Sequence, residues 1–119
     1  MQTAYIVDDH KDSAELLAFY LESHGFLTAT FHEFDKAYAA IATGHPCIAI
    51  IDLNVPGTMD AKTFIAKTKE NHPSLPIVIV SGDPRAKTAA ESIPALFLLK
   101  PFSLEDVFEQ VREYCPANK

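Results

Sequence analysis

The chain has 119 residues, of which 48% are hydrophobic and 22% are charged, which is the size and balance of one soluble globular domain. It carries 10 Lys and Arg against 16 Asp and Glu, a formal net charge of −6, which makes it a poor candidate for binding a nucleic-acid backbone by itself. No apolar run approaches the roughly 20 residues that span a bilayer, and the start does not read as a signal peptide, so we expect a cytoplasmic protein without membrane insertion.

Five short apolar runs are spaced along the chain, and each predicts a β-strand. They cover residues 4–7, 26–31, 47–51, 77–80 and 95–99. Three of them are unbroken by polar residues, a pattern typical of strands that are covered on both faces, as in a parallel sheet.

Amphipathic segments separate these runs and predict helices over residues 12–23, 33–43, 60–71 and 103–115. Their apolar residues recur at helical spacing between start and stop signals. A further helix, the fourth in chain order, is predicted after Asp83-Pro84, which is a favourable cap and first-turn pair. Its signal is weaker than the others, because residues 85–92 offer only alanines as an apolar face. This alternation predicts an α/β fold, in which helical crossovers join parallel strands and cover both sides of the sheet.

Polar residues follow four of the five runs. Asp8-Asp9 ends the first run, Asp52 the third, Ser81 the fourth and Lys100-Pro101 the fifth. Polar residues are common where a strand meets water, so any one of these positions carries little information. As a set they are informative, because the carboxyl ends of parallel strands share one edge, where ligands bind in open α/β sheets.

The chemistry of this set points to phosphate and a divalent cation. Carboxylates about 5 Å apart repel by on the order of 3 kcal/mol at an effective dielectric near 20, and oxygen ligands select a hard ion such as Mg²⁺. The Lys100 ammonium and the Ser81 hydroxyl add donors for a phosphoryl group. Asp52, alone at its strand end, is the natural nucleophile for an acyl phosphate, with Asp8 and Asp9 holding the metal.

Through these residues, in this order and spacing, the chain resembles a bacterial two-component response-regulator receiver domain. The resemblance covers essentially the whole length, so we expect residues 1–119 to form a single receiver domain with no output domain in the chain. It implies a flavodoxin-like (βα)5 fold with strand order 2-1-3-4-5, an order that the chain pattern alone does not select.

The resemblance also implies how phosphate and metal are bound. Asp52 would accept a phosphoryl group from a sensor histidine kinase or a histidine phosphotransfer protein. Asp9, Asp52 and the backbone carbonyl of Asn54 would bind Mg²⁺ directly, with Asp8 acting through water. Lys100 would pair with the phosphoryl oxygens.

A conformational switch is implied by the same resemblance. Ser81 would move to hydrogen-bond the phosphoryl group, and Phe97, in the position of the family's switch aromatic, would then pack inward. Lys100-Pro101 would hold a cis peptide that directs the lysine. The phosphorylated form would change its contacts with a downstream protein target, without direct binding to nucleic acid.

The segment between Ser81 and Lys100 is a few residues shorter than usual in the family, which bears on the usual signalling face but not on the phosphorylation site. Within it, Asp83 either caps the next helix or orients or repels the water that attacks the acyl phosphate. His10 is expected at the exposed rim of the site rather than as a ligand. Cys47 is expected as a buried thiol, and no chemistry is assigned to Cys115, because this pair matches no zinc or redox spacing.

Other functions fit parts of the pattern. The chain could be the receiver segment of a larger hybrid kinase or transcription regulator. A small Mg²⁺-dependent aspartyl-phosphate phosphohydrolase would want a second acid two residues after the nucleophile, where this chain has Asn54. A flavin or nucleotide binder would need a phosphate-binding loop after the first strand, and Asp8-Asp9 has the wrong charge for one.

Overall fold

The computed structural model describes residues 3–53, 55, 57–81, 96–99 and 103–115. Its elements run β1 (Thr3–Val7), α1 (Lys11–Glu22), β2 (Leu27–Phe31), α2 (Phe34–Gly44), β3 (Ile48–Asp52), α3 (Ala61–Asn71), β4 (Ile77–Ser81), β5 (Leu96–Leu99) and α5 (Leu104–Tyr114). Each lies within about one residue of its predicted bounds. The predicted fourth helix, over residues 83–92, lies outside the described residues.

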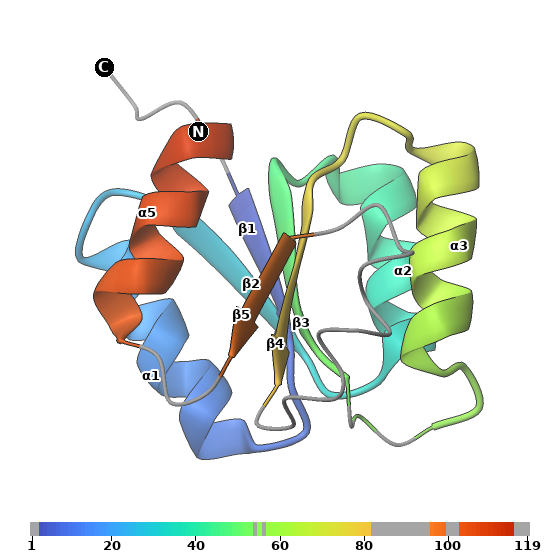
Figure 1. Cartoon of the computed structure of the whole chain (residues 1–119), viewed down its shortest axis with the longest axis horizontal. Helices are drawn as coiled ribbons and strands as arrows, with labels where there is room; N and C mark the ends of the chain where they lie inside the picture. Colours follow the sequence, from blue (N-terminus) through green and yellow to red (C-terminus); the bar gives the residue numbers. More distant parts are fainter. Residues whose placement is uncertain (1–2, 54, 56, 82–95, 100–102, 116–119) are drawn as a thin grey trace.

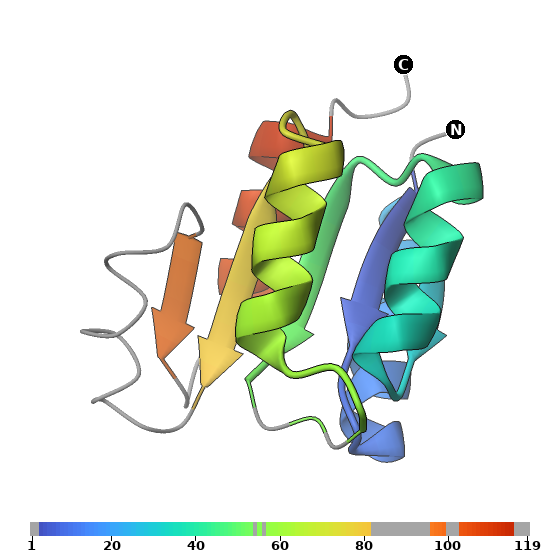
Figure 2. The ribbon, with the colours of Figure 1, turned by 90° about the vertical axis from the view of Figure 1, so that its right-hand side faces the viewer.

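The five strands form one parallel sheet in the order β2-β1-β3-β4-β5, which Figure 2 shows from the side of α2 and α3. The predicted fold class and strand order are therefore confirmed. Every residue of β3 and β4 is buried, whereas the edge strand β2 is half-exposed. Burial on both faces explains why the β3 and β4 sequences are unbroken apolar runs.

Helices cover the sheet on both faces, with α1 and α5 on one side and α2 and α3 on the other (Figure 1). Because successive strand residues point to opposite faces, Ile51 of β3 packs with Phe34 and Phe64 beneath α2 and α3, while Ile50 packs with Leu21 beneath α1. Within the described part of the chain, no helix is both long and apolar enough to cross a membrane.

Cys47 and Cys115 form a disulfide with a Cα–Cα distance of 5.4 Å. The interpretation of Cys47 as a core thiol and of Cys115 as a residue without chemistry is therefore wrong. Cys47 directly precedes β3, and Cys115 is the C-cap of α5, so the fold brings the start of one central strand next to the end of the last helix. The two cysteines are separated by 68 residues, so no local sequence pattern indicated this contact.

Gly44, the last residue of α2, leaves room for a core tyrosine. A Cβ atom at this position would overlap the hydroxyl group of Tyr5, which is buried and donates a hydrogen bond to the carbonyl oxygen of Ala40 at 3.2 Å. We expect Gly44→Ala to lower the free energy of unfolding, measured in urea, by about 1–3 kcal/mol, because the core must shift to accept the methyl group.

The control for this prediction is the double variant Tyr5→Phe/Gly44→Ala, which removes the atom closest to the new methyl group. In the Tyr5→Phe background, Gly44→Ala should lower the free energy of unfolding by less than it does in the wild type. The difference between the two losses should exceed the measurement error. A Gly44→Ala variant as stable as the wild type would contradict the predicted overlap.

A capping box closes the start of α5. The Ser103 Oγ accepts a hydrogen bond from the Asp106 backbone N–H at 3.1 Å, and the Asp106 carboxylate accepts one from the Ser103 backbone N–H at 3.0 Å. Each bond gives an acceptor to a backbone N–H that has no partner within the helix. Ser103→Ala should therefore lower the free energy of unfolding in urea by about 1 kcal/mol. Ser103→Asp, which keeps an oxygen acceptor, should retain most of the stability; equal losses in both variants would argue against a capping role.

Candidate functional site

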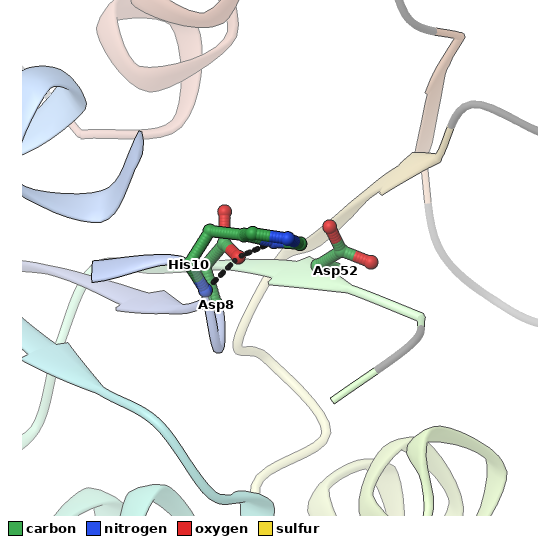
Figure 3. A group of neighbouring side chains, drawn as sticks. All are labelled: Asp8, His10 and Asp52. Carbon is green, nitrogen blue, oxygen red and sulfur yellow. Dashed lines mark hydrogen bonds and ion pairs between the residues drawn. The ribbon is translucent and has the colours of Figure 1, made fainter. Parts of the chain in front are cut away.

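The first and third strands bring two buried acids to the same edge of the sheet. Val7 of β1 lies opposite Ile51 of β3, so the next residues along these strands, Asp8 and Asp52, come together beyond this pair. Asp8 is 8% exposed and Asp52 is 4% exposed. Figure 3 shows their carboxylates at the carboxyl end of the sheet, on either side of the His10 ring.

The turn from β1 into α1 holds Asp8 in place. The Asp8 backbone N–H donates to the carbonyl oxygen of Phe31 at 3.0 Å, and its own carbonyl oxygen lies 2.8 Å from the His32 Nδ1. The Asp8 Oδ1 accepts a hydrogen bond from the His10 backbone N–H at 2.9 Å. These contacts orient the carboxylate toward the site before any ligand arrives.

His10 contacts both acids of the first strand end, which the sequence interpretation did not foresee. Its Nδ1 lies 3.4 Å from the Asp8 Oδ1 and 3.2 Å from the Asp9 Oδ1. The His10 side chain is 72% exposed, so the expectation of a rim position is confirmed, but the ring reaches inward from the rim. The sequence feature that could have predicted these contacts is the position of His10 directly after Asp8 and Asp9.

The fourth strand delivers Ser81 to the same edge. Asp52 lies opposite Val80, so Ser81 follows one residue beyond that pair, and it is 1% exposed. Phe97 of β5 lies opposite Ile79 and is half-buried against the core beneath α2 and α3. Ile79 and Ser81 are two residues apart in the same strand and so point to the same face. Because residues paired across strands also share a face of the sheet, Ser81 lies on the same face as Phe97.

The remaining predicted site residues are not described by the structure. Asn54, Asp83, Lys100 and Pro101 lie outside the described residues, and the predictions of a carbonyl ligand, a water-directing acid, a phosphate-binding ammonium and a cis peptide stay predictions.

The donor set of the described residues suits a divalent cation. One ligand atom each from Asp8, His10 and Asp52 lies within 4.8 Å of the others. Buried carboxylates this close need a positive charge between them, and oxygen-rich sites of this size hold hard ions such as Mg²⁺. The residues present therefore fit the ion that the sequence pattern predicted.

A cleft with a volume of about 570 Å³ opens beside Asp9, on the side of β2 and α2. It is lined by Asp9, Thr30, Phe31, His32, Glu33, Lys36 and Gly57. Asp9 is the acid of the β1 end that lines this cleft.

Comparison with known proteins identifies relatives of this domain. The chain is 33% identical over 104 residues to the nitrogen assimilation regulatory protein NtrX of Azorhizobium caulinodans, covering 84% of this chain and 23% of that protein. It is 30% identical over 105 residues to the DNA-binding transcriptional regulator NtrC of Salmonella typhimurium, covering 86% and 22%. The chain thus spans just under a quarter of the length of these curated relatives.

Solved structures share the fold. The receiver domain of the Francisella response regulator 1452 superposes with a TM-score of 0.86 at 20% identity, covering 96% of both chains. NtrX from Brucella abortus, in complex with ADP, superposes with a TM-score of 0.86 at 28% identity, covering 96% of this chain and 27% of that one.

The family match extends over nearly the whole domain. The family model of the response regulator receiver domain matches residues 4–112. This range begins in β1, ends in α5 and contains Asp8, Asp9 and Asp52 at the edge of the sheet. By this match and by the likeness to NtrX and NtrC, the chain belongs to the response regulator receiver domain family.

Proposed function

We propose that Asp52 accepts a phosphoryl group from the phosphohistidine of a sensor histidine kinase or a histidine phosphotransfer protein, and that the phosphorylated domain changes its contacts with a downstream protein target. The observation that carries this proposal is the position of the Asp52 carboxylate. It stands at the carboxyl end of a central strand, with ligand atoms of Asp8 and His10 within 4.8 Å.

The reaction is an in-line transfer between two side chains. An Asp52 carboxylate oxygen attacks phosphorus, the phosphorus–nitrogen bond of the donor breaks, and the donor imidazole leaves with the electron pair of that bond. Attack by water on the phosphorus later returns the carboxylate and releases inorganic phosphate. A receiver domain is a signalling domain rather than a classical enzyme, which disfavours the phosphohydrolase alternative.

The surrounding residues have separate roles in this proposal. Asp9, Asp52 and the Asn54 carbonyl would hold Mg²⁺, with Asp8 acting through water. When bound, the ion supplies positive charge that offsets the charge on the phosphoryl oxygens. Lys100 would pair with those oxygens from the end of β5.

Transmission to a target would start at Ser81. Its hydroxyl would turn toward the phosphoryl oxygens, and Phe97, on the same face of the neighbouring strand, would follow it inward. Phosphorylation is then a local electrostatic change that biases an element with two arrangements.

The proposal is tested by incubating the domain with acetyl phosphate and Mg²⁺ and measuring its intact mass. We expect the mass to increase by one phosphoryl group, and the increase to disappear when the ion is chelated by EDTA. An unchanged mass with both reagents present, at a pH where acetyl phosphate is stable, would contradict the proposal.

A second arrangement is favoured by the length of the relatives, one of which is named a DNA-binding transcriptional regulator. In it, this domain is the receiver part of a longer regulator, and phosphorylation of Asp52 controls a neighbouring output part. Sequencing the gene on both sides of the encoding region decides between the two arrangements.

A further inference from the structure

We propose that His10 adds a nitrogen ligand to the acidic pocket, so that the pocket binds divalent transition-metal ions such as Ni²⁺ more tightly than Mg²⁺. The inference rests on the metal pocket of the proposed function and specifies which class of ion that pocket prefers.

The distances around the His10 ring are those between ligands of one ion. Its Nδ1 lies 3.4 Å from the Asp8 Oδ1 and 3.2 Å from the Asp9 Oδ1. Two ligands bound at about 2.1 Å are about 3.0 Å apart at a right angle and about 3.4 Å apart in a tetrahedron. The nitrogen therefore stands at coordination spacing from each of the two oxygens. Asp52 offers a further oxygen, within 4.8 Å of ligand atoms of Asp8 and His10.

The backbone holds the ring where a ligand is needed. His10 is the N-cap of α1 with an extended backbone, φ −85° and ψ 100°, and its N–H donates to the same Asp8 carboxylate that its ring contacts. The ring is thus tied to the site through its own main chain. Because its side chain is 72% exposed, an incoming ion meets the imidazole before the buried carboxylates.

The identity of the added donor decides which ions gain. Imidazole nitrogen is a good ligand for Ni²⁺, Zn²⁺ and Cu²⁺, whereas Mg²⁺ prefers oxygen ligands and keeps several waters. Adding His10 to a carboxylate pocket therefore strengthens the binding of transition-metal ions and leaves the oxygen donors for Mg²⁺ in place.

A simpler role for the ring is to form a hydrogen bond or ion pair with the two acids. That role would affect how strongly the carboxylates attract every cation, and so would change the affinities for Ni²⁺ and Mg²⁺ together. The ratio of the two affinities separates the roles, because a nitrogen ligand acts on Ni²⁺ alone.

The test compares His10→Asn with His45→Asn by calorimetric titration of the whole domain with Ni²⁺ and with Mg²⁺. Asn is a good N-cap residue, so His10→Asn retains the start of α1 while removing the imidazole. His45 is exposed and has a positive φ of 49°, a conformation that Asn tolerates, so His45→Asn removes one surface imidazole without strain.

We expect the ratio of Ni²⁺ to Mg²⁺ affinity to fall by about tenfold or more in His10→Asn. The loss of a residue that only supports a metal ligand lowers affinity by about 10- to 100-fold, and the loss of a direct nitrogen ligand should lower the Ni²⁺ affinity by at least as much. His45→Asn should keep the wild-type ratio. In the wild type, substoichiometric Ni²⁺ should broaden the ring resonances of His10 in NMR spectra before those of the other histidines.

An unchanged ratio in His10→Asn would overturn the inference, and if the wild type is still phosphorylated with Mg²⁺ the proposed function stands. Absence of both Mg²⁺ binding and phosphorylation in the wild type would instead overturn the proposed function and, with it, the inference.

Discussion

Replacing Asp52 with asparagine is expected to abolish phosphorylation of the domain by acetyl phosphate. The amide of asparagine has nearly the shape of the carboxylate but is a very poor nucleophile, so no acyl phosphate forms. Asp52 occupies the end of β3 with 4% exposure, next to the carboxylates of the β1 end. The measurement is the intact mass after incubation with acetyl phosphate and Mg²⁺, with the wild type treated in parallel.

The matched control is Asp35→Asn, the same change at an exposed carboxylate in the first turn of α2. It should be phosphorylated as fully as the wild type. Urea unfolding of both variants establishes that each is folded, so that loss of labelling in Asp52→Asn reports chemistry. Labelling of Asp52→Asn at the wild-type level would remove Asp52 as the phosphoacceptor.

Reduction of the Cys47–Cys115 disulfide is expected to lower the free energy of unfolding by up to about 4 kcal/mol. The bond closes a loop with a sequence separation of 68 residues, and a cross-link of that length removes much of the entropy of the unfolded chain. The measurement is urea unfolding with and without a strong reductant such as TCEP.

The control is the double variant Cys47→Ala/Cys115→Ala, whose unfolding midpoint should not respond to reductant. It should match the reduced wild type more closely than the oxidised one. Equal unfolding curves for the wild type with and without reductant would contradict the predicted stabilisation. Because reducing compartments keep thiols reduced, the expected loss means that the stability of this domain depends on its redox surroundings.

The reductant dependence bears on one helix in particular. Cys115 is the C-cap of α5 and is fully buried, so the disulfide fastens the end of that helix to the start of β3. Val107 and Val111 pack the rest of α5 against the sheet. The helix therefore has apolar contacts of its own, and we expect it to remain docked after reduction in a less stable domain.

Local patterns in the sequence determined the elements of this fold. Residues 48–51 and 77–80 are unbroken apolar runs, and both became central strands because only a strand buried on two faces tolerates such a run. Ser103 and Asp106 are three residues apart in the sequence, which is the spacing of the capping box found at the start of α5. Such signals act over a few residues, so they can be recognised without knowing the rest of the structure.

The site was predictable in its acids, because the carboxyl ends of parallel strands must share an edge. Asp8, Asp52 and Ser81 each follow or end an apolar run, so their position at that edge followed from chain direction alone. The strand order did not follow from the pattern; it was implied by the resemblance to receiver domains and is confirmed in the sheet.

The tertiary structure alone decided the contacts between side chains that no periodicity relates. The pairing of Cys47 with Cys115 depends on where α5 ends relative to β3, and the reach of the His10 ring to two carboxylates depends on the turn between β1 and α1. Sequence patterns record which face a residue occupies and where an element begins or ends. They do not record the packing of one element against another, which sets these distances.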